Sequence, residues 1–286
     1  MSIAEHTLQE FVSGLDFGEA PRWHDGALWI SDIARREVLR IDAGSAAVTR
    51  AFSTPGEPSG LGWLPDGSLL VVQMEEHEVL RWDGVSLAPY ADTSAFSRWK
   101  LNDMVVAASG QAWISNMGFD YESEPACTTV LVGLDPQGKP FAAADGLHCP
   151  NGMAIDPSGT QLVVGQSASR EVLQFRITAS GELAERSIFG TLPQGGCSDG
   201  LCMDAAGALW IASPTTREFL RMEPGGRITD RVPTPGRHAI ACVLGGTDRR
   251  TLYCLTAPTL SLRAARGTAD GRIETVRVGI PGAGTP

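Results

Sequence analysis

One short pattern, a strand followed by a tight turn and a second strand, recurs along the 286-residue chain. The turn glycines Gly26, Gly67, Gly110, Gly159 and Gly207 are 41, 43, 49 and 48 residues apart. The copies of the pattern occupy residues 18–33, 59–73, 101–116, 150–166, 198–213 and 241–256. Repetition at this spacing indicates a fold assembled from copies of one small unit.

Two further short strands are predicted after each hairpin. The third strands start at Glu37, Glu78, Thr129, Glu171, Phe219 and Ser261, and the fourth strands start at Val48, Leu87, Pro140, Leu183, Ile228 and Ile273. Four strands per unit and six units predict an all-β fold, a six-bladed β-propeller with four-stranded blades. A β-sandwich is the competing all-β architecture, but six copies of one unit favour the radial arrangement. We expect residues 1–286 to form a single propeller domain, with residues 8–14 (LQEFVSG) adding an edge strand that closes the ring.

Composition excludes several classes of partner. The chain is 43% hydrophobic and 20% charged, which is typical of a globular protein, and its net charge is -10 without a basic cluster. Nucleic acid and anionic membranes are therefore not expected partners.

Neither a signal peptide nor a transmembrane span is apparent, so a cytoplasmic protein is expected. It is expected to be monomeric or weakly oligomeric, because a closed ring leaves few free edges. The six cysteines form no CxxC pair and are expected to be reduced thiols.

Polar residues occupy one equivalent position at the start of the innermost strands. That position holds Glu19, Ser59, Asn102, Asn151, Asp199 and either Ala241 or Cys242. Inner strands line the central channel, so these side chains are expected to converge. Carboxylates gathered in a partly dry channel are costly without a positive partner. Oxygen ligands suit one divalent cation, Ca²⁺, Mg²⁺ or Mn²⁺, while the nearby His148 and Cys149 keep Zn²⁺ and Fe²⁺ open.

Four motifs carry a family resemblance over the whole chain. They are G-E-x-P-x-W at 18–23, L-N-D at 101–103, P-N-G at 150–152 and S-D-G-x-C-x-D-x-x-G-x-L-W at 198–210. Together they resemble the gluconolactonase family, which includes senescence marker protein (regucalcin) and luciferin-regenerating enzyme. The resemblance implies that Glu19, Asn151 and Asp199 hold one divalent metal and that Asn102 contacts substrate. It also implies substrate-binding roles for Lys100 and Asp120, although Lys100 stands where sugar-lactone members have an arginine and lacks its bidentate fork.

The function that these residues favour is hydrolysis of a lactone to a hydroxy acid, with an aldonolactone as the favoured small-molecule substrate. Asp199 is the expected proton acceptor from water, and Lys100 and Asn102 would orient substrate oxygens. The neighbouring Trp99, Phe119 and Tyr121 favour an alternative, a bulkier or aromatic lactone.

Other interpretations stay open. Hydrolysis of phosphotriesters at the same metal site, or a propeller that binds metal and ligand without turnover, would use the same residues. Asn102 and Asn151 could instead bond local backbone, and Lys100 and Asp120 could be ordinary surface charges. Trp29, Trp113 and Trp210 occupy one position in three units, where packing between blades is the expected role.

Overall fold

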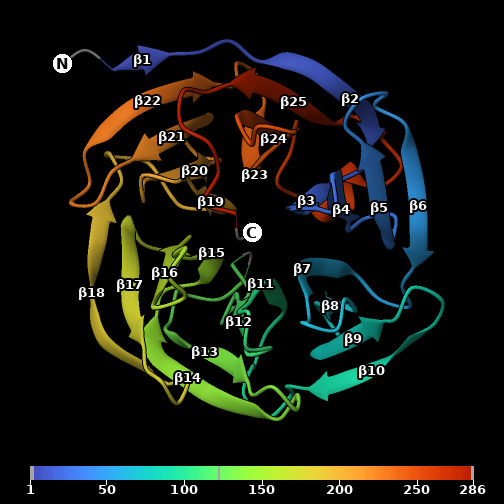
Figure 1. The fold of residues 1–286 in the computed structure, drawn as a ribbon, viewed down its shortest axis with the longest axis vertical. Helices are drawn as coiled ribbons and strands as arrows, with labels where there is room; N and C mark the ends of the chain where they lie inside the picture. Colours follow the sequence, from blue (N-terminus) through green and yellow to red (C-terminus); the bar gives the residue numbers. More distant parts are fainter. Residues whose placement is uncertain (1–2, 122, 285–286) are drawn as a thin grey trace.

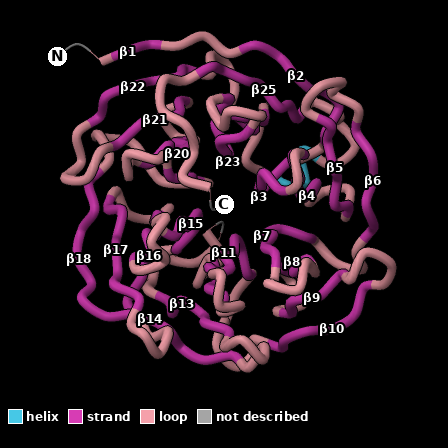
Figure 2. The backbone as a smooth tube through the Cα atoms, viewed as in Figure 1, coloured by secondary structure: helices cyan, strands magenta, loops and turns pink. Residues whose placement is uncertain are grey.

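The computed structural model describes residues 3–121 and 123–284, so both ends of the expected domain lie outside the described residues. Six sheets stand around a central axis like the blades of a propeller (Figure 1). This arrangement confirms the six-bladed β-propeller expected from the repeats. The regular secondary structure of the described residues is almost entirely strand, connected by loops and turns, with one short helix (Figure 2).

The first three blades each contain four antiparallel strands that follow one another in chain order from the axis to the rim. The first blade consists of β3 (Gly18–His24), β4 (Ala27–Asp32), β5 (Glu37–Asp42) and β6 (Val48–Ser53). The second consists of β7 (Pro58–Trp63), β8 (Leu69–Gln73), β9 (Glu78–Trp82) and β10 (Leu87–Asp92). The third consists of β11 (Leu101–Val106), β12 (Ala112–Asn116), β13 (Thr129–Leu134) and β14 (Pro140–Leu147).

The remaining blades follow the same plan, with additions from the N-terminal segment. The fourth consists of β15 (Pro150–Ile155), β16 (Gln161–Gln166), β17 (Glu171–Ile177) and β18 (Leu183–Thr191). The fifth consists of β19 (Leu201–Met203), β20 (Leu209–Ser213), β21 (Glu218–Met222) and β22 (Ile228–Pro233), with β1 (Ala4–Glu5) parallel to β22. The sixth consists of β23 (His238–Gly245), β24 (Thr251–Ala257), β25 (Gly271–Arg277) and β2 (Gln9–Leu15).

Closure of the ring confirms one expectation and corrects another. Strand β2 pairs antiparallel with β25 and forms the outer edge of the last blade, as the N-terminal pattern predicted. The strand expected from Ser261 is wrong, because Leu262–Ala265 form the helix α1, with the Ser261 hydroxyl accepting a hydrogen bond from the Ala264 N–H. Serine is a good N-cap, and the Leu-Arg-Ala-Ala run that follows favours helix. The strand expected from Ile273 is therefore the third of its blade, and β2 supplies the fourth.

Apolar side chains fill the space between neighbouring blades. Trp29 packs with Leu61 and Val71 of the second blade, and Trp210 packs with Leu244 of the sixth. Trp113 of the third blade packs in the same way against the fourth. The indole N–H groups of these tryptophans are buried without a hydrogen-bond partner among the described residues. Packing between blades is thus their role, as the repeat position predicted.

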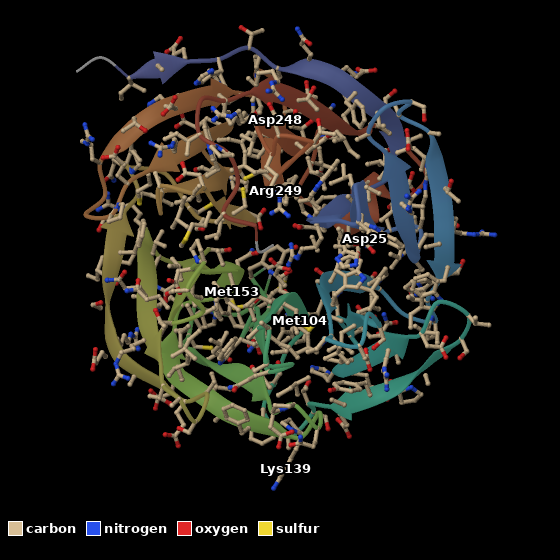
Figure 3. All side chains as sticks on the ribbon, in the orientation of Figure 1. Asp25, Met104, Lys139, Met153, Asp248 and Arg249 are labelled. Carbon is tan, nitrogen blue, oxygen red and sulfur yellow. The ribbon has the colours of Figure 1, made fainter. Side chains whose placement is uncertain are left out.

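Inner strands of adjacent blades approach one another closely beside the axis. A Cβ atom at Gly152 in β15 would lie 2.6 Å from the carbonyl oxygen of Asp199, and one at Gly200 would lie 2.7 Å from the Cα atom of Ala241. Only glycine fits such backbone contacts without displacing a strand. The labelled side chains of Met104 and Met153 lie on the inner strands of two neighbouring blades, whereas Lys139 extends outward at the rim (Figure 3).

Within residues 3–121 and 123–284, no helix has the length and apolar character needed to cross a membrane. The cytoplasmic location and the oligomeric state expected from the sequence stay predictions.

The contact at Gly152 predicts a large loss of stability for a small substitution. Gly152→Ala should lower the free energy of unfolding by about 2–3 kcal/mol, because the new methyl group meets backbone atoms that cannot turn away. Urea unfolding followed by circular dichroism measures the change. Gly279→Ala is the matched control, since a Cβ atom there meets no other atom within 4 Å. A loss at Gly152 no larger than that of the control would contradict the contact.

Candidate active site

Irregularities in the inner strands set the direction of the site side chains. The register of β3 on β4 shifts between Glu19 and Arg22, and that of β11 on β12 shifts between Leu101 and Met104. The same shift occurs in β15, between Pro150 and Met153. Such bulges re-aim a side chain relative to its sheet and are common beside active sites. Asn102 and Asn151 lie within their bulges, and Glu19 borders the bulge of β3.

Buried polar side chains hold the loops that lead into the inner strands. The Asp32 carboxylate, at the end of β4, accepts hydrogen bonds from the backbone N–H groups of Asp16 and Phe17, at 2.9 and 3.1 Å. Gln166, at the end of β16, accepts a 2.8 Å hydrogen bond from the His148 N–H. Both accepting side chains are fully buried. These bonds fix the entry of the chain into β3 and β15, and with it the position of Glu19 and Asn151.

Four of the predicted residues line one cavity of about 250 Å³ around the axis: Glu19, Asn102, Asn151 and Asp199. Ser59 does not line it, but its hydroxyl lies 3.5 Å from the amide oxygen of Asn102. Ala241 and Cys242 pack in the hydrophobic core instead. The structure therefore brings together the polar residues of four blades, while the sixth blade adds none of its inner-strand polar groups.

Hydrogen bonds connect Asn151 and Asp199 directly. The Asn151 Nδ2 group donates to Asp199 Oδ1 at 2.7 Å and to the Ser167 hydroxyl at 3.0 Å. The Ser167 hydroxyl in turn donates to the carbonyl of Ser198 at 2.8 Å. With Nδ2 used in this way, the amide oxygen of Asn151 accepts no hydrogen bond from any described residue. That oxygen is available to a ligand.

The two carboxyl groups of the site disfavour each other's ionised form. Burial raises the pKa of Glu19 well above its ordinary value, and the negative charge of Asp199 raises that pKa further. Burial also raises the pKa of Asp199 to about 7, against the lowering effect of the Asn151 amide. The nearest guanidinium, Arg22, forms a buried 2.6 Å ion pair with Asp103 and donates to the Leu61 carbonyl at 2.9 Å. The pair therefore lacks a cation of its own in the described part of the protein.

This donor set fits a hard divalent cation. Among the described residues, no three His, Cys, Asp or Glu side chains gather in a group that could hold a metal ion, so the amide oxygens would have to complete any ligand set. Two carboxylates and two amide oxygens are ligands that Ca²⁺, Mg²⁺ and Mn²⁺ accept. Burial raises the pKa of the Cys149 thiol to about 12, which disfavours the thiolate that softer metals prefer. His148 lies outside the cavity.

Lys100 and Asp120 border a second, neighbouring cavity of about 430 Å³. Lys100 Nζ lies 3.1 Å from a Glu57 oxygen and 2.7 Å from a Glu75 oxygen, and the Asp120 N–H donates to Glu124 at 3.2 Å. Met117, Tyr121 and Leu262 line both cavities. The structure thus places Lys100 and Asp120 beside the polar cluster rather than in it, and their contact with substrate stays a prediction.

Several cavity residues were not predicted from the sequence, although the repeats contain a signal for them. In five blades the residue directly after the second strand lines the cavity: Ile33, Met74, Met117, Ser167 and Pro214. The end of the second strand is thus a second equivalent position of the repeats, like the start of the first strand. The sixth blade contributes Leu260 and Leu262, and Leu262 belongs to the segment wrongly expected to be a strand.

The fold and the polar cluster on its axis define a six-bladed propeller with a partly polar cavity in the central channel. The family described as the SMP-30/Gluconolactonase/LRE-like region matches residues 17–258, and the chain belongs to this family.

Named relatives are distant but extend along most of the chain. The 6-deoxy-6-sulfogluconolactonase of Pseudomonas putida is 24% identical over 283 residues, which cover 94% of each chain. Regucalcin of Danio rerio is 22% identical over 250 residues, covering 85% of this chain and 83% of the relative. Among solved structures, the calcium-binding protein regucalcin of Agrobacterium tumefaciens superposes with a TM-score of 0.82 at 20% identity, covering 100% of this chain and 99% of the other. This structural likeness shows the fold.

The raised pKa of Asp199 predicts how stability depends on pH when divalent metal is absent. An acid whose pKa is higher in the folded state stabilises the fold fully below its unfolded pKa and loses that contribution as the pH rises to about 7. Asp199→Asn should therefore gain stability relative to wild type between about pH 4 and about pH 8, on the order of 4 kcal/mol over that range. Urea unfolding in chelator at several pH values measures the gain. A difference between the two proteins that does not change with pH would show that Asp199 titrates normally.

Proposed function

We propose that the protein is a divalent-metal-dependent hydrolase that opens a lactone ring to a hydroxy acid. The observation that carries the proposal is the cluster on the axis, where Glu19 and Asp199 face one cavity beside amide oxygens, with no lysine or arginine among the described residues that line it. The ligands in this proposal are Glu19, Asn151 and Asp199. The sulfogluconolactonase relative supports it, as does the pentonolactonase of Haloferax volcanii, which is 25% identical over 249 residues, covering 84% of this chain and 81% of the relative.

Each residue of the cluster has a chemical role in this proposal. A bound divalent cation supplies Lewis-acid polarisation of the lactone carbonyl and lowers the pKa of a bound water. Asp199 accepts the proton from the attacking water. The 2.7 Å hydrogen bond from Asn151 holds the Asp199 carboxylate in place. Asn102, from the neighbouring blade, orients the substrate with its amide.

Asp103 and Arg22 connect the inner strands that hold the cluster. Their buried ion pair connects β11 to β3, and the Arg22 guanidinium also donates to the carbonyl oxygens of Leu61 and Met104. One guanidinium therefore joins the inner strands of three blades. We infer that this pair keeps the distance between Glu19 and Asn102 constant, a positioning role and not a chemical one.

The test of this proposal is acid release from lactones, followed with a pH indicator on chelator-treated protein. Turnover should return when Ca²⁺, Mg²⁺ or Mn²⁺ is added, with Zn²⁺ and Fe²⁺ tested beside them and spontaneous hydrolysis subtracted. Asp199→Asn should lower kcat by about 10²–10⁴-fold, because it removes the proton acceptor. Asp145→Asn, at an exposed acid of the rim strand β14, is the matched control and should retain wild-type turnover.

The alternatives predict different results in the same assay. A protein that binds metal and ligand without turnover would release no acid from any lactone with any of the ions. A phosphotriesterase would hydrolyse activated phosphotriesters faster than lactones. Equal turnover by wild type and Asp199→Asn would show that Asp199 is not the proton acceptor.

A further inference from the structure

The cavity above the polar cluster has two chemically distinct parts. Its polar groups come from the four predicted residues, Ser167, the phenol of Tyr121 and the thiols of Cys149 and Cys197. The rest of the wall is dominated by large apolar side chains: Phe17, Ile33, Met74, Met117, Phe119, Leu260 and Leu262. A small polar end and a broad apolar wall are typical of sites that bind a mostly apolar molecule and orient it through one polar group.

No lysine or arginine belongs to the described lining of this cavity. Lys100, Arg263 and Arg266 border the neighbouring cavity instead, and two of them, Lys100 and Arg266, are ion-paired with Glu57 at 3.1 and 3.3 Å. Apart from the proposed metal ion, a substrate that carries a sulfonate, phosphate or carboxylate group would therefore meet two carboxyl groups and no lysine or arginine of the described lining. The lining argues against an anionic substrate.

The apolar wall continues to the surface. Leu260 and Tyr121 are 40% and 57% exposed, and both line the cavity. They are two of the six large hydrophobic side chains that are exposed in the described part of the chain. Phe119 and Met74, deeper in the wall, are nearly inaccessible to solvent. An exposed apolar rim that leads into a buried apolar wall is favourable for an apolar ligand and costs free energy while it is empty.

We propose that the substrate is a lactone with an apolar body, an aryl or alkyl lactone, rather than a polyhydroxylated sugar lactone. This inference rests on the proposed lactonase function. The ring carbonyl would lie at the polar end, near Asn102 and Asn151, and the apolar body would lie against Met74, Met117 and Phe119. The hydroxyl groups of a sugar lactone would face this wall without hydrogen-bond partners, which is unfavourable.

The volume sets a limit on the size of that body. At about 250 Å³ the cavity is slightly smaller than most sites for drug-sized ligands, which begin at about 300 Å³. A bicyclic aryl lactone or a lactone with a short alkyl chain is an occupant of suitable size. The methionine side chains Met74 and Met117 adapt to either shape, because they are flexible and their sulfur atoms contact aromatic ring edges favourably.

The experiment compares kcat/KM for dihydrocoumarin and γ-nonalactone with that for glucono-δ-lactone, using metal-loaded protein. We expect the apolar lactones to be preferred by about tenfold or more. Leu260→Asn keeps the size of the side chain and should lower kcat/KM for the apolar lactones by about tenfold, with a much smaller effect on the sugar lactone. Ile188→Asn is the matched control, since Ile188 is 52% exposed and lies on the rim strand β18 away from the cavity.

The outcomes separate this inference from the function on which it rests. A preference for glucono-δ-lactone, with metal-dependent turnover intact, would overturn the apolar substrate and leave the lactonase proposal standing. A Leu260→Asn effect equal on all lactones would also overturn it. Absence of turnover on every lactone would remove both proposals. Tyr121→Ser provides a second, independent substitution of the rim, and thermal unfolding of each variant verifies that it is folded.

Discussion

Backbone contacts between inner strands are the constraint on which the site depends. Gly152 and Gly200 each follow a polar site residue, and each leaves space only for the backbone of the next blade. The glycines therefore set how closely the blades approach the axis. If the inner strands stood farther apart, Asn151 Nδ2 could not lie 2.7 Å from Asp199 Oδ1, and the carboxyl groups would be separated by solvent. The close approach that Gly200 allows therefore explains why an acid, Asp199, stands at the start of an otherwise apolar segment.

Burial of like charges is the energetic consequence of that close approach. Glu19 and Asp199 have raised pKa values because the inner strands exclude water and bring the two groups near each other. A buried structural acid elsewhere in the protein has a cationic partner. Asp204 is also fully buried, but it forms a 2.6 Å ion pair with Arg221, and its carboxylate accepts backbone N–H groups in its turn. Two buried carboxyl groups without such a partner lower the free energy of unfolding, and such a cost is characteristic of functional residues.

The sequence predicted what repetition can encode and missed what depends on contacts between distant segments. Equivalent positions in the six units predicted the blades, the packing of Trp29 between them and the placement of Glu19 in the channel with Asp199. The bulges in the inner strands were not predicted, because they depend on the pairing register with the next strand. The ion pairs of Lys100 were also missed, since Glu57 lies 43 residues away and meets Lys100 only through the fold. The helix α1 was missed because its residues were assigned to a strand by analogy with the other units.

Closure of the ring by the first strand has a consequence for how the protein folds. Gln9 in β2 pairs with Thr275 in β25, so the earliest strand of the last blade is synthesised long before its partner. Until β25 has been synthesised, both the N-terminal segment and the open side of the first blade expose edges that other strands can join. Contacts of such long sequence separation form slowly, because the chain must lose much of its freedom before they do. The same pairing that leaves the finished ring without a gap therefore makes its assembly a late, all-or-none event that is vulnerable to aggregation while the chain is incomplete.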